Sequence, residues 1–180
     1  MVYELLGTGF EEVEAIAPVD LLRRAGVEVS TVGVNGKIVA GSHGIGVQAD
    51  ITLEQMDLSD CEMIIVPGGM GGVASIRASR SAMDALLTCW EQGKFVAAIC
   101  AGPTVLADLH IPDGKNATCY PGCEAGMGKA HMVADAAAVR DGKLITGTSA
   151  GCAVPFGLQL IEALKGKEAA QAIARQIVIR

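Results

Sequence analysis

The sequence predicts an α/β domain: a mostly parallel sheet with helices on both faces. Short apolar runs alternate with longer segments whose apolar residues recur at helical spacing, which is typical of strands joined by crossover helices. Hydrophobic residues make up 51% of the chain and aromatic residues only 3%. The core must therefore consist of small and aliphatic side chains, as in strands that are buried on both faces. A length of 180 residues fits a single domain, residues 1–180.

The first half of the chain reads as alternating strands and helices. We expect helices that end at glycines, a natural helix stop, in residues 11–26 and 81–93. A glycine-rich segment, residues 37–50, predicts short antiparallel strands or a hairpin, and residues 54–60 predict a turn or short helix. The expected strands are residues 2–6, 27–34, 62–66 and 94–100.

The second half continues the pattern. A helix is expected in residues 101–109, a strand end in 116–122, and two strands around an Asp-Gly turn in 132–149. Two closing helices are expected in residues 152–166 and 167–179.

Composition excludes several classes of function. The net charge is −6, and no basic stripe with interleaved aromatic residues occurs, so nucleic acid is not an expected partner. The apolar runs are too short to cross a bilayer and no leader is evident, so we expect no membrane binding and a cytoplasmic location. A reducing compartment keeps thiols free. Of the six cysteines, Cys119 and Cys123 are spaced C-x-x-x-C without a second zinc-type pair, so we predict no metal site.

The first strand end, "GTGFEE", allows two interpretations. Gly7 and Gly9 resemble the start of a dinucleotide fingerprint, but Glu12 stands where the third glycine belongs and its charge would repel a pyrophosphate. Alternatively, the acidic residues favour the first turn of a helix. Glu14 lies further along among apolar residues, where partial burial could raise its pKa and suit it to acid or base catalysis.

The other two strand ends are "PGGMGG" and "AICAG". The first is either a plain turn or an anion pocket in which the amides of Gly68 and Gly69 hold an oxyanion. The second has the pattern of a nucleophile elbow, with Cys100 as nucleophile and the amide of Ala101 directed at the same site. Helix amides at that turn would lower the pKa of the thiol. The alternative is a buried structural cysteine, and no histidine is spaced as an obvious base.

Together these motifs resemble the DJ-1/ThiJ/PfpI superfamily, in particular its DJ-1 branch. The resemblance rests on "GFEEVEAIAPVDLLRRAG", "VPGG", "AAICAGPTVLA", "TCYPG" and "ITGTSAGCAVPFGLQLIEALKGKEAA", and covers nearly the whole chain. It implies a flavodoxin-like three-layer sandwich and a homodimer. It also implies that Cys100 is the reactive nucleophile, that a protonated Glu14 bonds its sulfur, that Gly68 and Gly69 face the sulfur, and that Arg24 lies near the site at the dimer interface.

The resemblance implies a function, and this chain departs from the family pattern at two positions. Members of the branch are described as cofactor-independent glyoxalases or deglycases that act on small reactive carbonyls. Alternatively, the cysteine is oxidised by peroxide to a sulfinate, as in an oxidative-stress sensor or chaperone. Tyr120 stands where the best-known animal members have a histidine and other members also have an aromatic residue, and His43 stands where some have an arginine. Peptidase activity is not expected, because the peptidase branch has a histidine at the position of Ala101.

Overall fold

A seven-stranded sheet forms the centre of the computed structural model, which describes residues 1–179. The strand order is β10-β11-β7-β6-β1-β2-β5, and every pairing is parallel except that of β10 with β11. Its inner five strands have the order of a flavodoxin-like sheet, so the predicted fold class is confirmed. The strands are β1 (Val2–Leu6), β2 (Val29–Gly33), β5 (Ile51–Thr52), β6 (Met63–Val66), β7 (Phe95–Ile99), β10 (Ala138–Asp141) and β11 (Leu144–Gly147).

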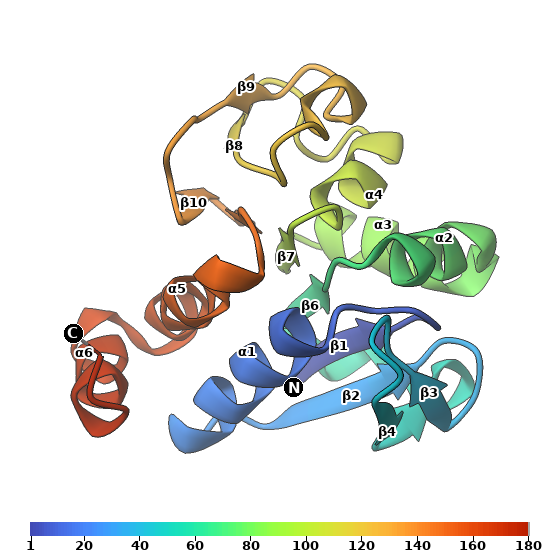
Figure 1. Cartoon of the computed structure of the whole chain (residues 1–180), viewed down its shortest axis with the longest axis horizontal. Helices are drawn as coiled ribbons and strands as arrows, with labels where there is room; N and C mark the ends of the chain where they lie inside the picture. Colours follow the sequence, from blue (N-terminus) through green and yellow to red (C-terminus); the bar gives the residue numbers. More distant parts are fainter. Residues whose placement is uncertain (180) are drawn as a thin grey trace.

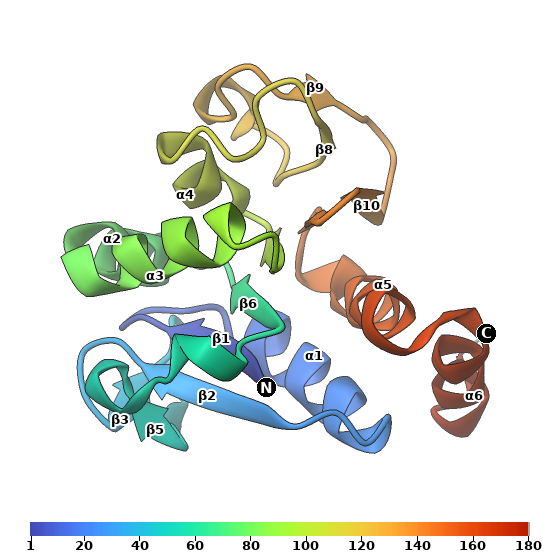
Figure 2. The same cartoon turned by 180° about the vertical axis from the view of Figure 1, so that it is seen from behind.

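Helices cover both faces of the sheet, as Figures 1 and 2 show. Side chains alternate between two cores because successive residues of a strand point to opposite faces. Tyr3 and Leu5 join the core under one helical layer, and Val2 joins the other. The first layer contains α2 (Met70–Ala78), α3 (Arg80–Glu91) and α4 (Pro103–Asp108); the second contains α1 (Glu12–Arg24) and α5 (Ala153–Lys165), with α6 (Lys167–Gln176) packed on α5.

The smaller elements follow the sequence pattern. The glycine-rich segment forms the predicted hairpin, with β3 (Ile38–Ala40) antiparallel to β4 (Gly46–Gln48). Two short ladder strands, β8 (Asn116–Ala117) and β9 (His131–Met132), pair outside the main sheet. The remaining turns are 3₁₀ helices: η1 (Leu53–Gln55), η2 (Leu58–Asp60), η3 (Glu124–Gly126) and η4 (Ala150–Cys152).

Helix α2 is the one long element that the sequence pattern does not predict. Its first turn contains Gly71 and Gly72, which are poor helix formers. A Cβ on Gly72 would lie 2.7 Å from Cα of Phe10, so this glycine permits close packing of α2 against the loop after β1. Tertiary packing therefore outweighs helix propensity here.

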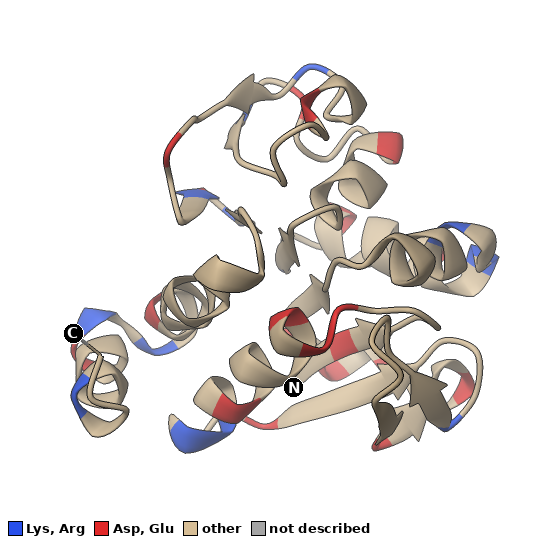
Figure 3. Ribbon diagram, in the orientation of Figure 1, with Lys and Arg blue, Asp and Glu red and all other residues tan. Residues whose placement is uncertain are grey.

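Charge is distributed along α1 as its dipole favours. Glu12 and Glu14 lie in its first turn and Arg23 and Arg24 in its last, as Figure 3 shows by colour at the two ends of the helix. Within residues 1–179, no helix combines the length and apolar character needed to span a membrane.

Candidate active site

The three predicted strand ends meet at one edge of the sheet. Strands β1, β6 and β7 are neighbours and parallel, so the loops that follow them converge. A cavity of about 570 Å³ opens there. Its lining includes six of the residues that the sequence singled out: Glu14, His43, Gly69, Cys100, Ala101 and Tyr120.

Cys100 occupies the predicted nucleophile elbow between β7 and α4. Its φ of 65° lies in the left-handed region, which L-residues rarely adopt. The strained turn is held by a hydrogen bond from its amide to the carbonyl of Gly147 at 3.0 Å. Gly102 makes the turn possible, since a Cβ there would lie 2.6 Å from the carbonyl oxygen of Val66. Backbone strain of this kind is concentrated at functional sites.

Glu14 lies beside Cys100 and is almost completely buried, with 1% of its surface exposed. Its carboxyl group lies close enough to the Cys100 side chain for each group to shift the pKa of the other. Its Oε2 also accepts a hydrogen bond from the amide of Gly68 at 3.0 Å. A Cβ at position 68 would overlap this oxygen and lie 3.0 Å from the Cys100 sulfur. The glycine therefore lets the backbone approach both reactive groups.

The glycine loop divides its amides between these two groups. The amides of Gly69 and Ala101 lie near the Cys100 sulfur and act to lower its pKa. The amide of Gly68 donates instead to Glu14. The expectation that both glycine amides face the sulfur therefore needs correction, because the Glu14 carboxyl lies in the path of the Gly68 N–H.

Burial disfavours the ionised forms of both Glu14 and Cys100, and Glu14 further opposes the ionisation of Cys100. Burial, reinforced by the nearby charge of Glu11, raises the pKa of Glu14. Burial and then the charge of an ionised Glu14 raise the pKa of Cys100 to about 12, although the amides of Ala101 and Gly69 act in the opposite direction. The amides alone therefore do not lower the thiol pKa as the sequence pattern predicted. A thiolate at neutral pH requires a neutral Glu14.

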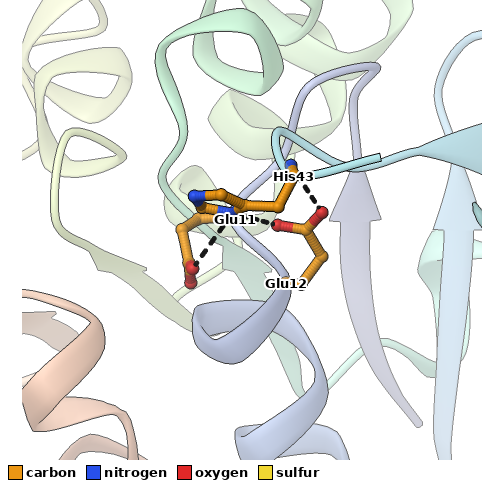
Figure 4. Close-up of side chains that lie close together, drawn as sticks. All are labelled: Glu11, Glu12 and His43. Atoms are coloured by element: carbon orange, nitrogen blue, oxygen red, sulfur yellow. Dashed lines mark hydrogen bonds and ion pairs between the residues drawn. The ribbon is translucent and has the colours of Figure 1, made fainter. Parts of the chain in front are cut away.

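Glu11, Glu12 and His43 lie close together (Figure 4), and Glu11 and His43 line the cavity. Glu12 is 6% exposed, and its carboxylate accepts the His43 amide at 2.7 Å and the His43 Nδ1 at 2.9 Å. Although burial opposes ionisation, these bonds lower the pKa of Glu12 to about 2, and Glu12 in turn raises the pKa of His43.

This cluster fastens the β3–β4 hairpin to α1. Within residues 1–179 it is the one group of three His, Cys, Asp or Glu side chains whose ligand atoms are close enough together to hold a cation. The Ser42 hydroxyl and the Ile45 amide also donate hydrogen bonds to the Glu12 carboxylate, so its oxygens already have partners within the protein. Glu11 accepts the amide of Glu14 at 2.8 Å as the N-cap of α1. Carboxylates thus occupy the position that a pyrophosphate would need.

Tyr120 and Arg24 differ in their relation to the site. The amide of Tyr120 donates to the carbonyl of Cys100 at 2.8 Å, and its side chain lines the cavity while 48% exposed. Arg24 ends α1 and pairs with Asp20 at 2.7 Å. Ten helical residues separate it from Glu14, which is about 15 Å along the axis. Within its own chain, Arg24 is therefore not near the site, and the expected approach to a site at a dimer interface would need a second chain.

Sequence reasoning missed two contributors to the cavity. Ala150 and Cys123 both line the cavity, and the amide of Ala150 acts to lower the pKa of Glu14. Both come from loops that reach the site only through the tertiary fold. The run of small residues after the strand at 144–147, "TSAG", was the available signal for the first.

A model of the DJ-1/PfpI family matches residues 1–163. The chain belongs to the DJ-1/PfpI family. Protein dj-1beta of Drosophila melanogaster is 36% identical over 177 residues, which cover 97% of this chain and 95% of that protein. A deglycase of Pyrococcus abyssi is 29% identical over 157 residues, covering 87% of this chain and 94% of that protein.

Solved structures of DJ-1 proteins have the same fold. The crystal structure of Drosophila melanogaster DJ-1beta superposes with a TM-score of 0.94 at 36% identity, covering 99% of this chain and 97% of that chain. Toxoplasma gondii DJ-1 in its oxidized form superposes with a TM-score of 0.91 at 34% identity, covering 98% of this chain and 97% of that chain. In this DJ-1/PfpI protein, the strained Cys100 and the buried Glu14 thus lie at the bottom of one cavity.

Proposed function

We propose that this protein is an enzyme that converts methylglyoxal-like dicarbonyls into hydroxy acids without a cofactor. The observation that supports this best is that the buried Glu14 carboxyl lies next to the strained Cys100, with both residues lining one cavity. A nucleophile and a proton carrier in contact are what aldehyde addition followed by proton transfer requires. The deglycase among its relatives agrees with this class of chemistry.

At the start of the reaction, Cys100 is a thiolate and Glu14 is protonated, so the two side chains together carry one negative charge. The Cys100 thiolate attacks the aldehyde carbon, and neutral Glu14 gives its proton to the developing alkoxide, which forms a hemithioacetal. The Glu14 carboxylate then takes the proton from that carbon and returns it to the neighbouring carbonyl carbon, while the hydroxyl proton of the hemithioacetal passes to the former carbonyl oxygen of that neighbour, which leaves a thioester. Water hydrolyses the resulting thioester and restores the thiol. Overall, one dicarbonyl and one water molecule become one hydroxy acid, so the reaction needs no redox partner.

Amides and a hydroxyl group stabilise the oxyanions of this sequence. The amides of Gly69 and Ala101 already point at the sulfur, so they lie beside the carbon that it attacks. The Tyr120 hydroxyl can bond a substrate oxygen from the cavity wall. Its ordinary pKa near 10 makes it a poor base, so the proton transfers fall to Glu14. The same addition step would serve a deglycase that acts on early sugar or dicarbonyl adducts.

Lactate production from methylglyoxal tests the proposal. The wild-type chain should form lactate with no added cofactor, and Cys100→Ala and Glu14→Gln should each lose at least about a hundredfold in turnover. Glu28→Gln, an exposed carboxyl group, and Cys152→Ser, outside the cavity lining, serve as matched controls. Full turnover in either active-site variant would refute the enzyme proposal.

A second candidate function is oxidation sensing by Cys100. The amides of Gly69 and Ala101 and the Glu14 carboxyl could all donate to the oxygens of a sulfinate. Here the output would be altered stability, partner binding or chaperone activity instead of turnover. Mild peroxide should then add about 32 Da to Cys100 alone. Oxidation spread evenly over the six cysteines would count against this function.

We also propose that the chain acts as a homodimer. Helix α1 exposes two large apolar side chains beside the site, Val13 at 52% and Ile16 at 41%. An apolar helix face near the cavity suits a second copy of the chain, which would also bring the Arg24 end of α1 into an interface.

A further inference from the structure

The cavity above Cys100 contains a second thiol, Cys123. Both cysteines line the same space of about 570 Å³, and both are partly exposed. The other cysteines are differently placed. Cys61, Cys89 and Cys119 are buried, and Cys152 is not part of the cavity lining. Two thiols that share one cavity can react with one another.

Backbone hydrogen bonds fasten Cys123 to the elbow. The amide of Tyr120 donates to the carbonyl of Cys100 at 2.8 Å, and the amide of Cys123 donates to the carbonyl of Tyr120 at 2.9 Å. The second bond closes a four-residue turn, in which the first and last Cα atoms lie within about 7 Å. Cys123 is thus carried on a turn that is anchored directly to the nucleophile.

The residues that lead into Cys123 are exposed: Tyr120, Pro121 and Gly122 belong to no helix or strand. The Cys123 side chain itself is partly buried and packs against the core. A disulfide needs Cα atoms within about 7 Å of each other, so the reaction requires the two cysteines to come within that distance. Cys119, on the same segment, is a weaker candidate because it is buried, and burial raises its pKa to about 11.

We propose that Cys123 is a resolving thiol that captures oxidised Cys100 as an intramolecular disulfide. The inference rests on the proposed function, since it needs a reactive thiolate at Cys100. The thiolate attacks a hydroperoxide, the O–O bond breaks, an alcohol or water leaves, and Cys100 becomes a sulfenic acid. The Cys123 sulfur then attacks the Cys100 sulfur. The S–O bond breaks, the S–S bond forms, and water leaves with the Cys123 proton.

The disulfide would make oxidation of the site reversible. A sulfenic acid that is not captured goes on to a sulfinate, which ordinary thiols do not reduce. A dithiol reductant restores both thiols from the disulfide by exchange. Cys123 thereby protects the nucleophile during peroxide exposure.

Peptide mapping after peroxide treatment tests this role. Wild type, Cys123→Ser and the control Cys152→Ser are exposed to hydrogen peroxide, blocked with an alkylating agent and digested without reductant. The wild type and the control should yield a Cys100–Cys123 linked peptide that a dithiol removes. Cys123→Ser should accumulate Cys100 sulfinate several-fold faster. Peptide mapping is necessary because the Cys61 and Cys89 sulfurs lie 3.4 Å apart. A disulfide between these two cysteines would change the mass of the whole protein by the same amount as a Cys100–Cys123 disulfide.

Two outcomes would overturn the proposal in different ways. Equal sulfinate rates in wild type and Cys123→Ser, with no linked peptide, would remove the resolving role and leave Cys100 chemistry intact. If Cys100 reacts with neither peroxide nor the alkylating agent, both the resolving role and the proposed function fail.

Discussion

The amide of Gly68 donates a hydrogen bond to Oε2 of Glu14 at 3.0 Å. This contact joins the loop after β6 to the helix after β1 and places the carboxyl group against the Cys100 sulfur. Position 68 thus controls the geometry of both reactive groups, although its own side chain is a hydrogen atom.

Gly68→Ala should lower the reactivity of Cys100. The added methyl group would overlap Oε2 of Glu14 and lie 2.7 Å from Cβ of Cys100, so one of these groups must move. We expect a loss of at least about tenfold in the alkylation rate of Cys100 and a destabilisation of about 1–3 kcal/mol. Gly46→Ala is the control, since a Cβ there meets nothing within 4 Å. Unchanged alkylation in Gly68→Ala would show that the Glu14 contact is unimportant.

Tyr120→Phe should lower kcat/KM for methylglyoxal by about tenfold, the value of one lost hydrogen bond to a developing charge. The rate of Cys100 alkylation should stay the same, because the hydroxyl acts on the substrate and not on the sulfur. The chain has two tyrosines, and Tyr3 bonds Asp57 and Asp60 through its hydroxyl, outside the cavity. Tyr3→Phe is therefore the matched control. Equal kcat/KM in Tyr120→Phe and wild type would exclude a substrate contact.

Val13→Glu should convert the proposed homodimer into single chains. A charge on the apolar face of α1 cannot be buried against a second copy without a large desolvation cost. Ile38→Glu places the same charge on the β3–β4 hairpin, at a residue that is 81% exposed, and should leave the dimer intact. Sedimentation velocity distinguishes the two. A wild-type chain that sediments as a monomer would remove the dimer proposal altogether.

Glu4 should make folding stability fall as pH rises. It is fully buried on β1 beside Thr31 of β2 and Ile65 of β6, and among the described residues neither of its oxygens has a hydrogen-bond partner. Burial raises its pKa well above the usual value, while the charge of Arg23 acts weakly in the opposite direction. The folded chain thus keeps a proton that the unfolded chain releases above its ordinary pKa of about 4.3.

Stability should therefore be greatest below that ordinary pKa and decline above it by up to about 1.4 kcal/mol per pH unit, until the folded pKa is reached. Denaturant unfolding between pH 5 and pH 8 measures the slope. Glu4→Gln should flatten it, Glu4→Leu should raise stability at neutral pH, and the exposed control Glu28→Gln should change neither. A slope that persists in Glu4→Gln would mean that another group is responsible.

Local sequence patterns predicted much of the fold, because they reflect interactions between residues that are close together in the chain. Strand–helix alternation yields the parallel sheet, and "AICAG" yields the strained elbow at Cys100, since small neighbours are a local steric requirement. These two features depend on residues that are adjacent in sequence. Glu14 is buried as predicted, but of its apolar neighbours only Ala15 is buried, whereas Val13 and Ile16 are exposed, so adjacency does not explain it.

Features set by the meeting of distant loops could not be predicted in the same way. The Gly68 amide turns to Glu14 instead of sulfur because α1 places the carboxyl group there. Ala150 and Cys123 reach the cavity on loops after other strands. Arg24 lies at the far end of α1 because helical rise separates it from Glu14, so any approach to a site needs a second chain.

The ionisation of Cys100 remains the quantity on which the proposed chemistry depends. Thiolate absorbance near 240 nm, titrated in wild type and in Cys100→Ser, isolates this residue from the other five cysteines. If Glu14 keeps its proton and the charge lies on sulfur, the difference should show one thiolate forming well below the ordinary thiol value of about 8.5. A Cys100 that ionises only at or above that value would contradict the proposal and leave the residue a structural part of the elbow.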